Sequence, residues 1–132
     1  MDTSKQKKVL IIEDNPVFIK MLAMRMEASG YIVVKAEDGL TGLNAAKAES
    51  PDIILLDLML PVMDGHKVCR FLKADRNLQN IPIAILTSRD LYDDAELAEK
   101  SGADAFIPKA TKPVIILDVI QKLLDKAAVN NN

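Results

Sequence analysis

Five short apolar runs recur along the 132-residue chain, and their pattern leaves few folds open to it. Three of the runs are four residues long and apolar at every position, as expected of parallel strands that helices cover on both faces. We therefore interpret all five runs as β-strands. They are Val9–Ile12, Ile32–Val34, Ile53–Leu56, Ile83–Leu86 and Ala105–Ile107.

Helical patterns fill the segments that follow these runs. In the first and last of these segments, apolar residues recur every three or four positions, as on one face of an amphipathic helix. Pro16 suits the first turn of the first helix, and Gly30 suits its end. The two apolar stripes are Val17, Met21, Met24 and Ala28, and Ile116, Ile120, Leu123 and Ala127.

Capping residues predict three further helices. An Asp or Ser precedes each of them and can act as its N-cap, and Gly102 can end the last one. The helices are Gly39–Ala48, Gly65–Asp75 and Arg89–Lys100, and the caps are Asp38, Asp64 and Ser88.

Strands that alternate with helices predict an α/β domain with an open, doubly wound parallel sheet. Right-handed crossovers leave few topologies, of which the strand order 2-1-3-4-5 is the best candidate. In such sheets, ligands bind beyond the carboxyl ends of the strands, where the winding reverses. The sequence therefore places the expected site between the first and third strands.

Composition excludes several classes of protein. A length of 132 residues suits one domain, and 49% hydrophobic with 27% charged residues is typical of a globular protein. The lone Cys69 and the polar start of the chain, which lacks the apolar stretch of a secretory signal, predict a location in the reducing cytoplasm. No apolar segment is long enough to predict a membrane span. A net charge of -2 argues against direct binding of nucleic acid.

Acidic residues end the first and third predicted strands. Glu13 and Asp14 follow the first strand, and Asp57 follows the third. Because these strands are expected to be neighbours, the carboxylates would raise one another's pKa unless a cation lay among them. Hard oxygen ligands favour Mg²⁺, which commonly shares its shell with a phosphoryl group. We therefore predict a magnesium site here.

Complementary groups follow the fourth and fifth strands. Thr87 and Ser88 offer hydroxyls, and Lys109 offers an ammonium group. A carboxylate nucleophile, a metal, a hydroxyl and a lysine are the groups needed to accept a phosphoryl group and stabilise its oxygens. Any one of these residues alone is more often a helix cap or a solvated loop residue. Their combination at one edge of the sheet favours a chemical role.

These residues lie in motifs that resemble the receiver domain of two-component response regulators, over about Lys7 to Lys126. The resemblance implies a flavodoxin-like (βα)5 three-layer sandwich in which Asp57 is the phosphoacceptor. It also implies that Mg²⁺ is held by Glu13, Asp14, Asp57 and the Met59 carbonyl, with Thr87 and Lys109 on the phosphoryl oxygens. The motifs are VLIIEDNP, DIILLDLMLPVMDG, IAILTS and GADAFIPK.

The resemblance further implies a switch, in which Thr87 moves towards the phosphoryl group and Phe106 turns inward. This would alter the face formed by the fourth helix, fifth strand and fifth helix. The alternative is that Phe106 is a permanent core residue. Met59 and Arg89 occupy positions that tune phosphoryl lifetime in relatives, and their bulk and charge predict slow loss.

One departure from the family pattern concerns the lysine. Ala110, rather than the usual proline, follows Lys109. A cis bond before a residue other than proline costs about 2.5 to 4 kcal/mol, so we expect the Lys109–Ala110 bond to be trans.

The resemblance implies protein partners on two surfaces. A sensor histidine kinase or a histidine phosphotransfer protein would bind the first helix and the active-site edge, and an effector would bind the switch face. Residues 1–132 are expected to form a single receiver domain, monomeric or weakly dimeric when phosphorylated, with output through another protein. The ends MDTSKQKK and AAVNNN are expected to be solvated tails.

Three other functions compete with this interpretation. A Mg²⁺-dependent phosphohydrolase needs a second acid two residues after the nucleophile, where this chain has Met59. In a flavin mononucleotide carrier, Glu13 and Asp14 would repel the phosphate. A receiver that is never phosphorylated is disfavoured because the residue set is complete.

Several residues receive only structural roles. His66 is expected to be exposed in the first turn of a helix, since no acid or thiol pattern accompanies it. Cys69 is interpreted as a small core residue. Met21, Met24 and Met26 are interpreted as fillers of core gaps or of a rim, with a binding stripe as the alternative.

Overall fold

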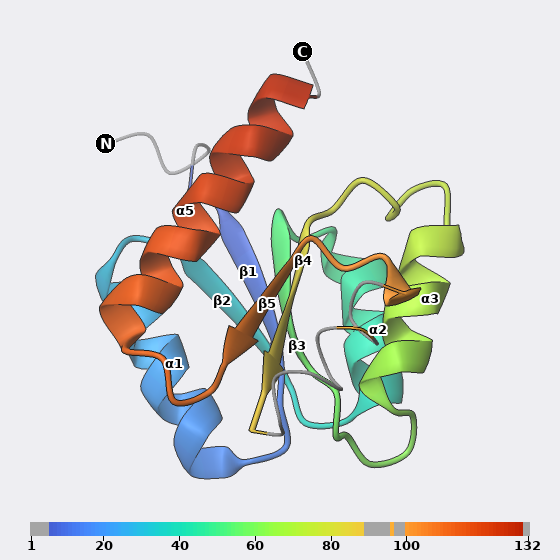
Figure 1. Ribbon diagram of the computed structural model, residues 1–132, viewed down its shortest axis with the longest axis horizontal. Helices are drawn as coiled ribbons and strands as arrows, with labels where there is room; N and C mark the ends of the chain where they lie inside the picture. Colours follow the sequence, from blue (N-terminus) through green and yellow to red (C-terminus); the bar gives the residue numbers. More distant parts are fainter. Residues whose placement is uncertain (1–5, 89–95, 97–99, 131–132) are drawn as a thin grey trace.

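The computed structural model describes residues 6–88, 96 and 100–130. Its five strands form one parallel sheet in the order β2-β1-β3-β4-β5, which confirms the predicted flavodoxin-like architecture (Figure 1). Each strand differs from its predicted run by no more than two residues. The strands are β1 Lys8–Ile12, β2 Ile32–Ala36, β3 Ile53–Asp57, β4 Ile83–Thr87 and β5 Ala105–Pro108.

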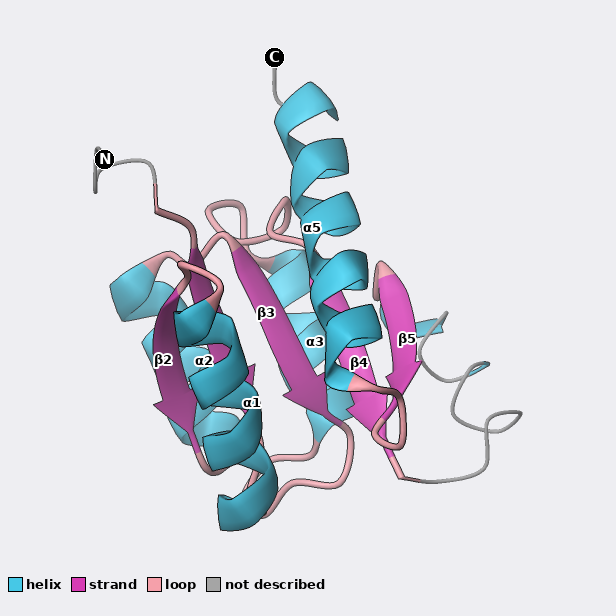
Figure 2. Ribbon diagram, turned by 90° about the vertical axis from the view of Figure 1, so that its left-hand side faces the viewer, coloured by secondary structure: helices cyan, strands magenta, loops and turns pink. Residues whose placement is uncertain are grey.

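Helices cover both faces of this sheet, as the apolar strands require. Helices α1 and α5 lie on one face, and α2 and α3 lie on the other (Figures 1 and 2). Most of the predicted helix Arg89–Lys100 lies outside the described residues, but Ser101 is helical and Gly102 follows it with a φ of 85°. The four described helices are α1 Pro16–Ala28, α2 Gly39–Glu49, α3 Gly65–Ala74 and α5 Pro113–Asn130.

Side-chain caps fix where three helices begin. Asp38 accepts a hydrogen bond from the Thr41 amide, and Asp64 accepts one from the Lys67 amide, which confirms both predicted N-caps. The cap of α1 is Asn15, which the sequence analysis did not identify. The predicted cap Ser88 cannot be compared, because the residues that follow it lie outside the described part of the chain.

The three central strands supply both layers of the core. Residues that alternate along β1, β3 and β4 point to opposite faces, and nearly all of them are fully buried. One cluster packs under α2 and α3, and the other packs under α1 and α5. Rigid central strands of this kind hold the residues at their carboxyl ends in fixed positions.

The face that α1 turns to the sheet differs from the stripe that predicted this helix. Val17 is 77% exposed and Met24 is 63% exposed, and Met21 is half-buried. Apolar residues occupy most faces of α1, so their spacing does not indicate which stripe contacts the sheet. The buried residues are Ile19, Leu22, Ala23 and Met26.

The carboxyl end of the chain also departs from expectation. Helix α5 continues to Asn130, so most of the segment expected as a solvated tail is helical. Ala127 and Ala128 have the highest helix propensity of any residue type, and no proline or glycine interrupts them. Neither α5 nor any other described helix combines the length and apolarity needed to cross a membrane.

The chain leaves β5 through a trans peptide bond. No cis bond occurs among the described residues, so Lys109–Ala110 is trans, as predicted. The Lys109 amide donates to the Thr87 carbonyl at 2.8 Å, which continues the contact between β4 and β5 past their ends. This bond fixes the start of the Lys109 side chain beside the carboxyl edge of the sheet.

Candidate functional site

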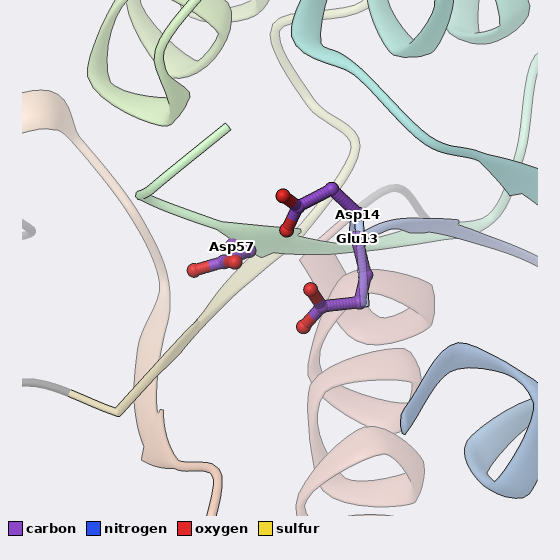
Figure 3. Close-up of side chains that lie close together, drawn as sticks. All are labelled: Glu13, Asp14 and Asp57. Atoms are coloured by element: carbon purple, nitrogen blue, oxygen red, sulfur yellow. The ribbon is translucent and has the colours of Figure 1, made fainter. Parts of the chain in front are cut away.

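Three carboxyl groups meet where β1 and β3 end. Glu13 and Asp14 directly follow β1, and Asp57 is the last residue of β3. These strands are paired neighbours, so their carboxyl ends lie at the same edge of the sheet. One carboxylate oxygen from each residue lies within 4.8 Å of the others (Figure 3). The predicted convergence of the acids is therefore present.

The three acids differ in their contact with solvent. Glu13 is fully buried and Asp57 is 3% exposed, whereas Asp14 is exposed. Burial raises the pKa of Glu13, and the nearby negative charge of Asp57 adds to this effect. Hydrogen bonds from Lys109 and from the Asn15 amide lower the pKa and only partly offset the burial. Glu13 is thus a desolvated carboxyl group, and the exposed Asp14 follows it directly in the chain.

Lys109 brings a positive charge into this cluster. Its Nζ lies 2.5 Å from Glu13 Oε1 and 3.1 Å from Asp57 Oδ2, and its side chain is 18% exposed. Burial lowers the pKa of Lys109, but pairing with these two carboxylates outweighs burial and raises the pKa above its usual value. The ammonium group therefore stays charged and holds two buried acids together.

Backbone amides orient the same carboxylates. The Asn15 amide donates to Glu13 Oε2 at 3.0 Å, and the Met59 amide donates to Asp57 Oδ1 at 3.2 Å. The Gly65 amide donates to the Leu58 carbonyl at 2.9 Å, which closes the loop between β3 and α3. The loop geometry thus fixes the orientation of the Asp57 carboxylate.

The remaining predicted site residues surround this cluster. Thr87 ends β4 and is 1% exposed. Phe106 lies opposite Ile85 in the sheet and is half-buried against the core cluster under α2 and α3. Met59 is 57% exposed in the loop after β3. Arg89 lies outside the described residues.

The donor set fits a hard divalent cation. Lys109 pairs with two of the three carboxylates, those of Glu13 and Asp57, so the cluster keeps an excess of negative charge among oxygen donors. Mg²⁺ prefers oxygen ligands of this kind and retains several waters, which the exposed Asp14 side would admit. Glu13, Asp14 and Asp57 are therefore the described residues able to hold it.

His66 and Cys69, two residues of α3, lie outside the site. His66, in the first turn of α3, is half-buried rather than exposed, because its ring contacts Ser101. Its Nδ1 lies 3.0 Å from Ser101 Oγ. Cys69 is fully buried, and burial raises the pKa of its thiol to about 11, which confirms its role as a core residue.

Comparison with known proteins agrees with this fold and site. The model of the response regulator receiver domain matches residues 9–121. The chain is 34% identical over 121 residues to the polar-differentiation response regulator DivK of Brucella ovis, covering 92% of this chain and 98% of that relative. The chain belongs to the response regulator receiver domain family of two-component systems.

Solved receiver structures resemble the whole fold. A CheY-like receiver domain protein from Methanospirillum hungatei has a TM-score of 0.89 at 25% identity, covering 96% of this chain and 99% of that one. The receiver domain of a sensor histidine kinase from Pseudomonas aeruginosa has a TM-score of 0.85 at 29% identity, covering 91% and 98%. That structure has a magnesium ion coordinated in its active site cleft.

Proposed function

We propose that this chain is a phosphorelay response regulator in which Asp57 accepts a phosphoryl group from a phosphohistidine. The partner would be a sensor histidine kinase or a histidine phosphotransfer protein. The gathering of Glu13, Asp14 and Asp57 at one edge of the sheet, with Lys109 paired to Glu13 and Asp57, is the observation that supports this proposal. With such partners, the expected compartment is the cytoplasm.

The reaction exchanges one bond to phosphorus for another. A carboxylate oxygen of Asp57 forms the new P–O bond as the P–N bond of the phosphohistidine breaks. The departing imidazole keeps the electron pair and takes up a proton, and Asp57 becomes an acyl phosphate. Two groups keep Asp57 poised for this step, because the Met59 amide and Lys109 each contact one of its oxygens.

Charge neutralisation comes from groups beside Asp57. Glu13, Asp14 and Asp57, with the Met59 carbonyl, would hold Mg²⁺, which neutralises phosphoryl oxygens when bound. Lys109 and Thr87 would contact the remaining oxygens. The chain has Met59, not a second acid, two residues after Asp57, so we propose slow self-catalysed dephosphorylation rather than turnover of external substrates.

The output signal would depend on a change in conformation that couples Thr87 to Phe106. Movement of Thr87 towards the phosphoryl group would let the half-buried Phe106 turn inward and reshape the face that includes β5 and α5. An effector protein would bind that face, on a monomer or on a weak phosphorylation-dependent dimer. Met59 and Arg89 would extend the lifetime of the phosphoryl group by shielding it. Residues 1–132 would act as one receiver domain without direct contact to nucleic acid.

The phosphoryl donor has a suitable docking surface on α1. Val17, Met21 and Met24 form an exposed or half-exposed apolar stripe along α1. Exposed apolar surface of this kind marks protein contacts. The stripe begins two residues after the N-cap Asn15, so a helix docked along it would bring a donor histidine towards Asp57.

The test of the proposed function is phosphorylation in solution. The protein is incubated with Mg²⁺ and a small phosphoryl donor such as acetyl phosphate, and its intact mass is measured. We expect a gain of one phosphoryl group, and we expect chelation of Mg²⁺ with EDTA to prevent it. A mass unchanged by the donor across a range of Mg²⁺ concentrations would contradict the proposal.

A charge placed on the α1 stripe should separate docking from chemistry. We expect Met24→Asp to slow transfer from a phosphorylated histidine phosphotransfer protein about tenfold or more, because an apolar contact becomes a desolvated charge. Transfer from acetyl phosphate should stay unchanged. The matched control is Phe71→Asp, since Phe71 is 54% exposed on α3 at the other face of the sheet. Equal slowing by both variants would exclude docking on α1.

A further inference from the structure

Lys109 has a third neighbour that the family motifs do not include. Its Nζ lies over the ring of Phe18, 5.2 Å from the ring centroid. Phe18 belongs to the first turns of α1, is half-buried, and packs against the core cluster under α1 and α5. The ammonium group thus has the two carboxylates of Glu13 and Asp57 and an aromatic face as neighbours.

The hydrogen bonds that position the Phe18 ring start from Glu13, a residue of the acidic cluster. Glu13 Oε2 accepts from the Asn15 amide at 3.0 Å, and Asn15 Oδ1 accepts from the Phe18 amide at 3.0 Å. The Phe18 ring then contacts Lys109, which pairs with Glu13 Oε1. The contacts thus connect Glu13, Asn15, Phe18 and Lys109 and return to Glu13. The carboxylate that binds the lysine therefore also helps to fix the position of the ring.

A cation held over an aromatic face is attracted to it, and the attraction is stronger where water is excluded. The Lys109 side chain is only 18% exposed, so most of it is excluded from water. A lysine side chain otherwise has several rotatable bonds and no preferred direction for its charge. The ring therefore restricts the position of the ammonium group, and this restriction does not depend on the ion pairs with Glu13 and Asp57.

We propose that Phe18 is a positioning residue that holds the Lys109 ammonium group beside Asp57 for phosphoryl transfer. This inference rests on the proposed function. When Asp57 becomes an acyl phosphate, the contact of Lys109 must pass from a carboxylate oxygen to a phosphoryl oxygen. The contact with Phe18 needs no such exchange, so it keeps the charge at the site in both states.

The alternative role of Phe18 is core packing alone, and two substitutions distinguish the roles. Phe18→Leu keeps an apolar side chain but removes the aromatic face, whereas Phe18→Tyr keeps the face. The control is Ile19→Val, which loosens the buried side of the same helix away from Lys109. Each variant is phosphorylated with acetyl phosphate at saturating Mg²⁺, and the rate constant is followed by intact mass.

We expect Phe18→Leu to lower the phosphorylation rate constant about fivefold, as loss of a partly desolvated cation–π contact implies. Phe18→Tyr and Ile19→Val should stay within about twofold of the wild type on the same reasoning. A rate for Phe18→Leu equal to the wild type, or an equal fall in Phe18→Leu and Ile19→Val, would overturn the inference. So would a fall in Phe18→Tyr as large as that in Phe18→Leu.

A second measurement does not depend on phosphorylation. In nuclear magnetic resonance spectra, the ring current of Phe18 should move the Lys109 ε-CH₂ proton signals upfield, and this shift should vanish in Phe18→Leu and persist in Phe18→Tyr. If the wild type gains no phosphoryl group, the proposed function fails although the ring-current shift is present. If the wild type is phosphorylated and the shift is absent, the inference about Phe18 alone fails.

Discussion

Asp57→Asn should gain no mass from acetyl phosphate under conditions in which the wild type gains one phosphoryl group. Asn has nearly the same shape as Asp, so β3 and its loop should keep their structure. Its amide group is neutral and is not a nucleophile towards phosphorus, so the P–O bond cannot form. The substitution also removes one of the two carboxylates that bind Lys109.

The matched control for this substitution is Asp118→Asn. Asp118 is an exposed acid on α5 that pairs with Lys122 four residues later, so its replacement changes the net charge equally. We expect this variant to be phosphorylated like the wild type. Peptide mapping of the wild-type adduct should place it on Asp57, and a stable adduct on Asp57→Asn at any other residue would contradict the assignment.

Gly65→Ala should weaken both stability and phosphorylation, because the added methyl group has no space. A Cβ atom at Gly65 would lie 2.3 Å from the Asp57 carbonyl oxygen and 2.6 Å from the Leu58 Cα atom. Both contacts are with backbone, which cannot rotate away as a side chain can. We expect a loss of about 2–3 kcal/mol in the free energy of unfolding, typical of overpacking at a tight site.

Relief of this clash must move the loop that carries the phosphoacceptor. The Gly65 amide closes the loop onto the Leu58 carbonyl, so displacement of α3 would misalign the Asp57 carboxylate. Urea unfolding followed by circular dichroism measures the stability, since the chain has no Trp, and acetyl phosphate labelling measures the chemistry. The control is the exposed neighbour Lys67→Ala. A Gly65→Ala variant as stable as the control would contradict the packing argument.

These predictions rest on different parts of one site. Asp57 is tested as the reacting group, Gly65 as the residue that lets α3 approach β3, and Phe18 as the residue that orients Lys109. A loss of phosphorylation in Gly65→Ala under conditions in which the variant is still folded would show that loop geometry, rather than global unfolding, controls Asp57. The stability measurement therefore decides how the labelling result is interpreted.

Local signals were sufficient to predict most of the fold. Continuous apolar runs marked the buried strands, and caps such as Asp38 and Asp64 marked two helix starts. The same signals were ambiguous where apolar residues surround a helix, and α1 turned a different face to the sheet from the stripe that predicted it. The prediction that His66 is exposed was wrong, because it considered the chemistry of the side chain and not its contact with Ser101.

The sequence by itself determined the topology and the acids of the site. The carboxyl ends of parallel strands share one edge, so Glu13, Asp14 and Asp57 had to meet once the strand order was known. Only the tertiary structure decided how the lysine is held. The contact of Phe18 with Lys109 joins residues 91 positions apart on different elements, and no local pattern specifies such a distance. It depends on how far α1 is rotated against the sheet, which packing of the whole core sets.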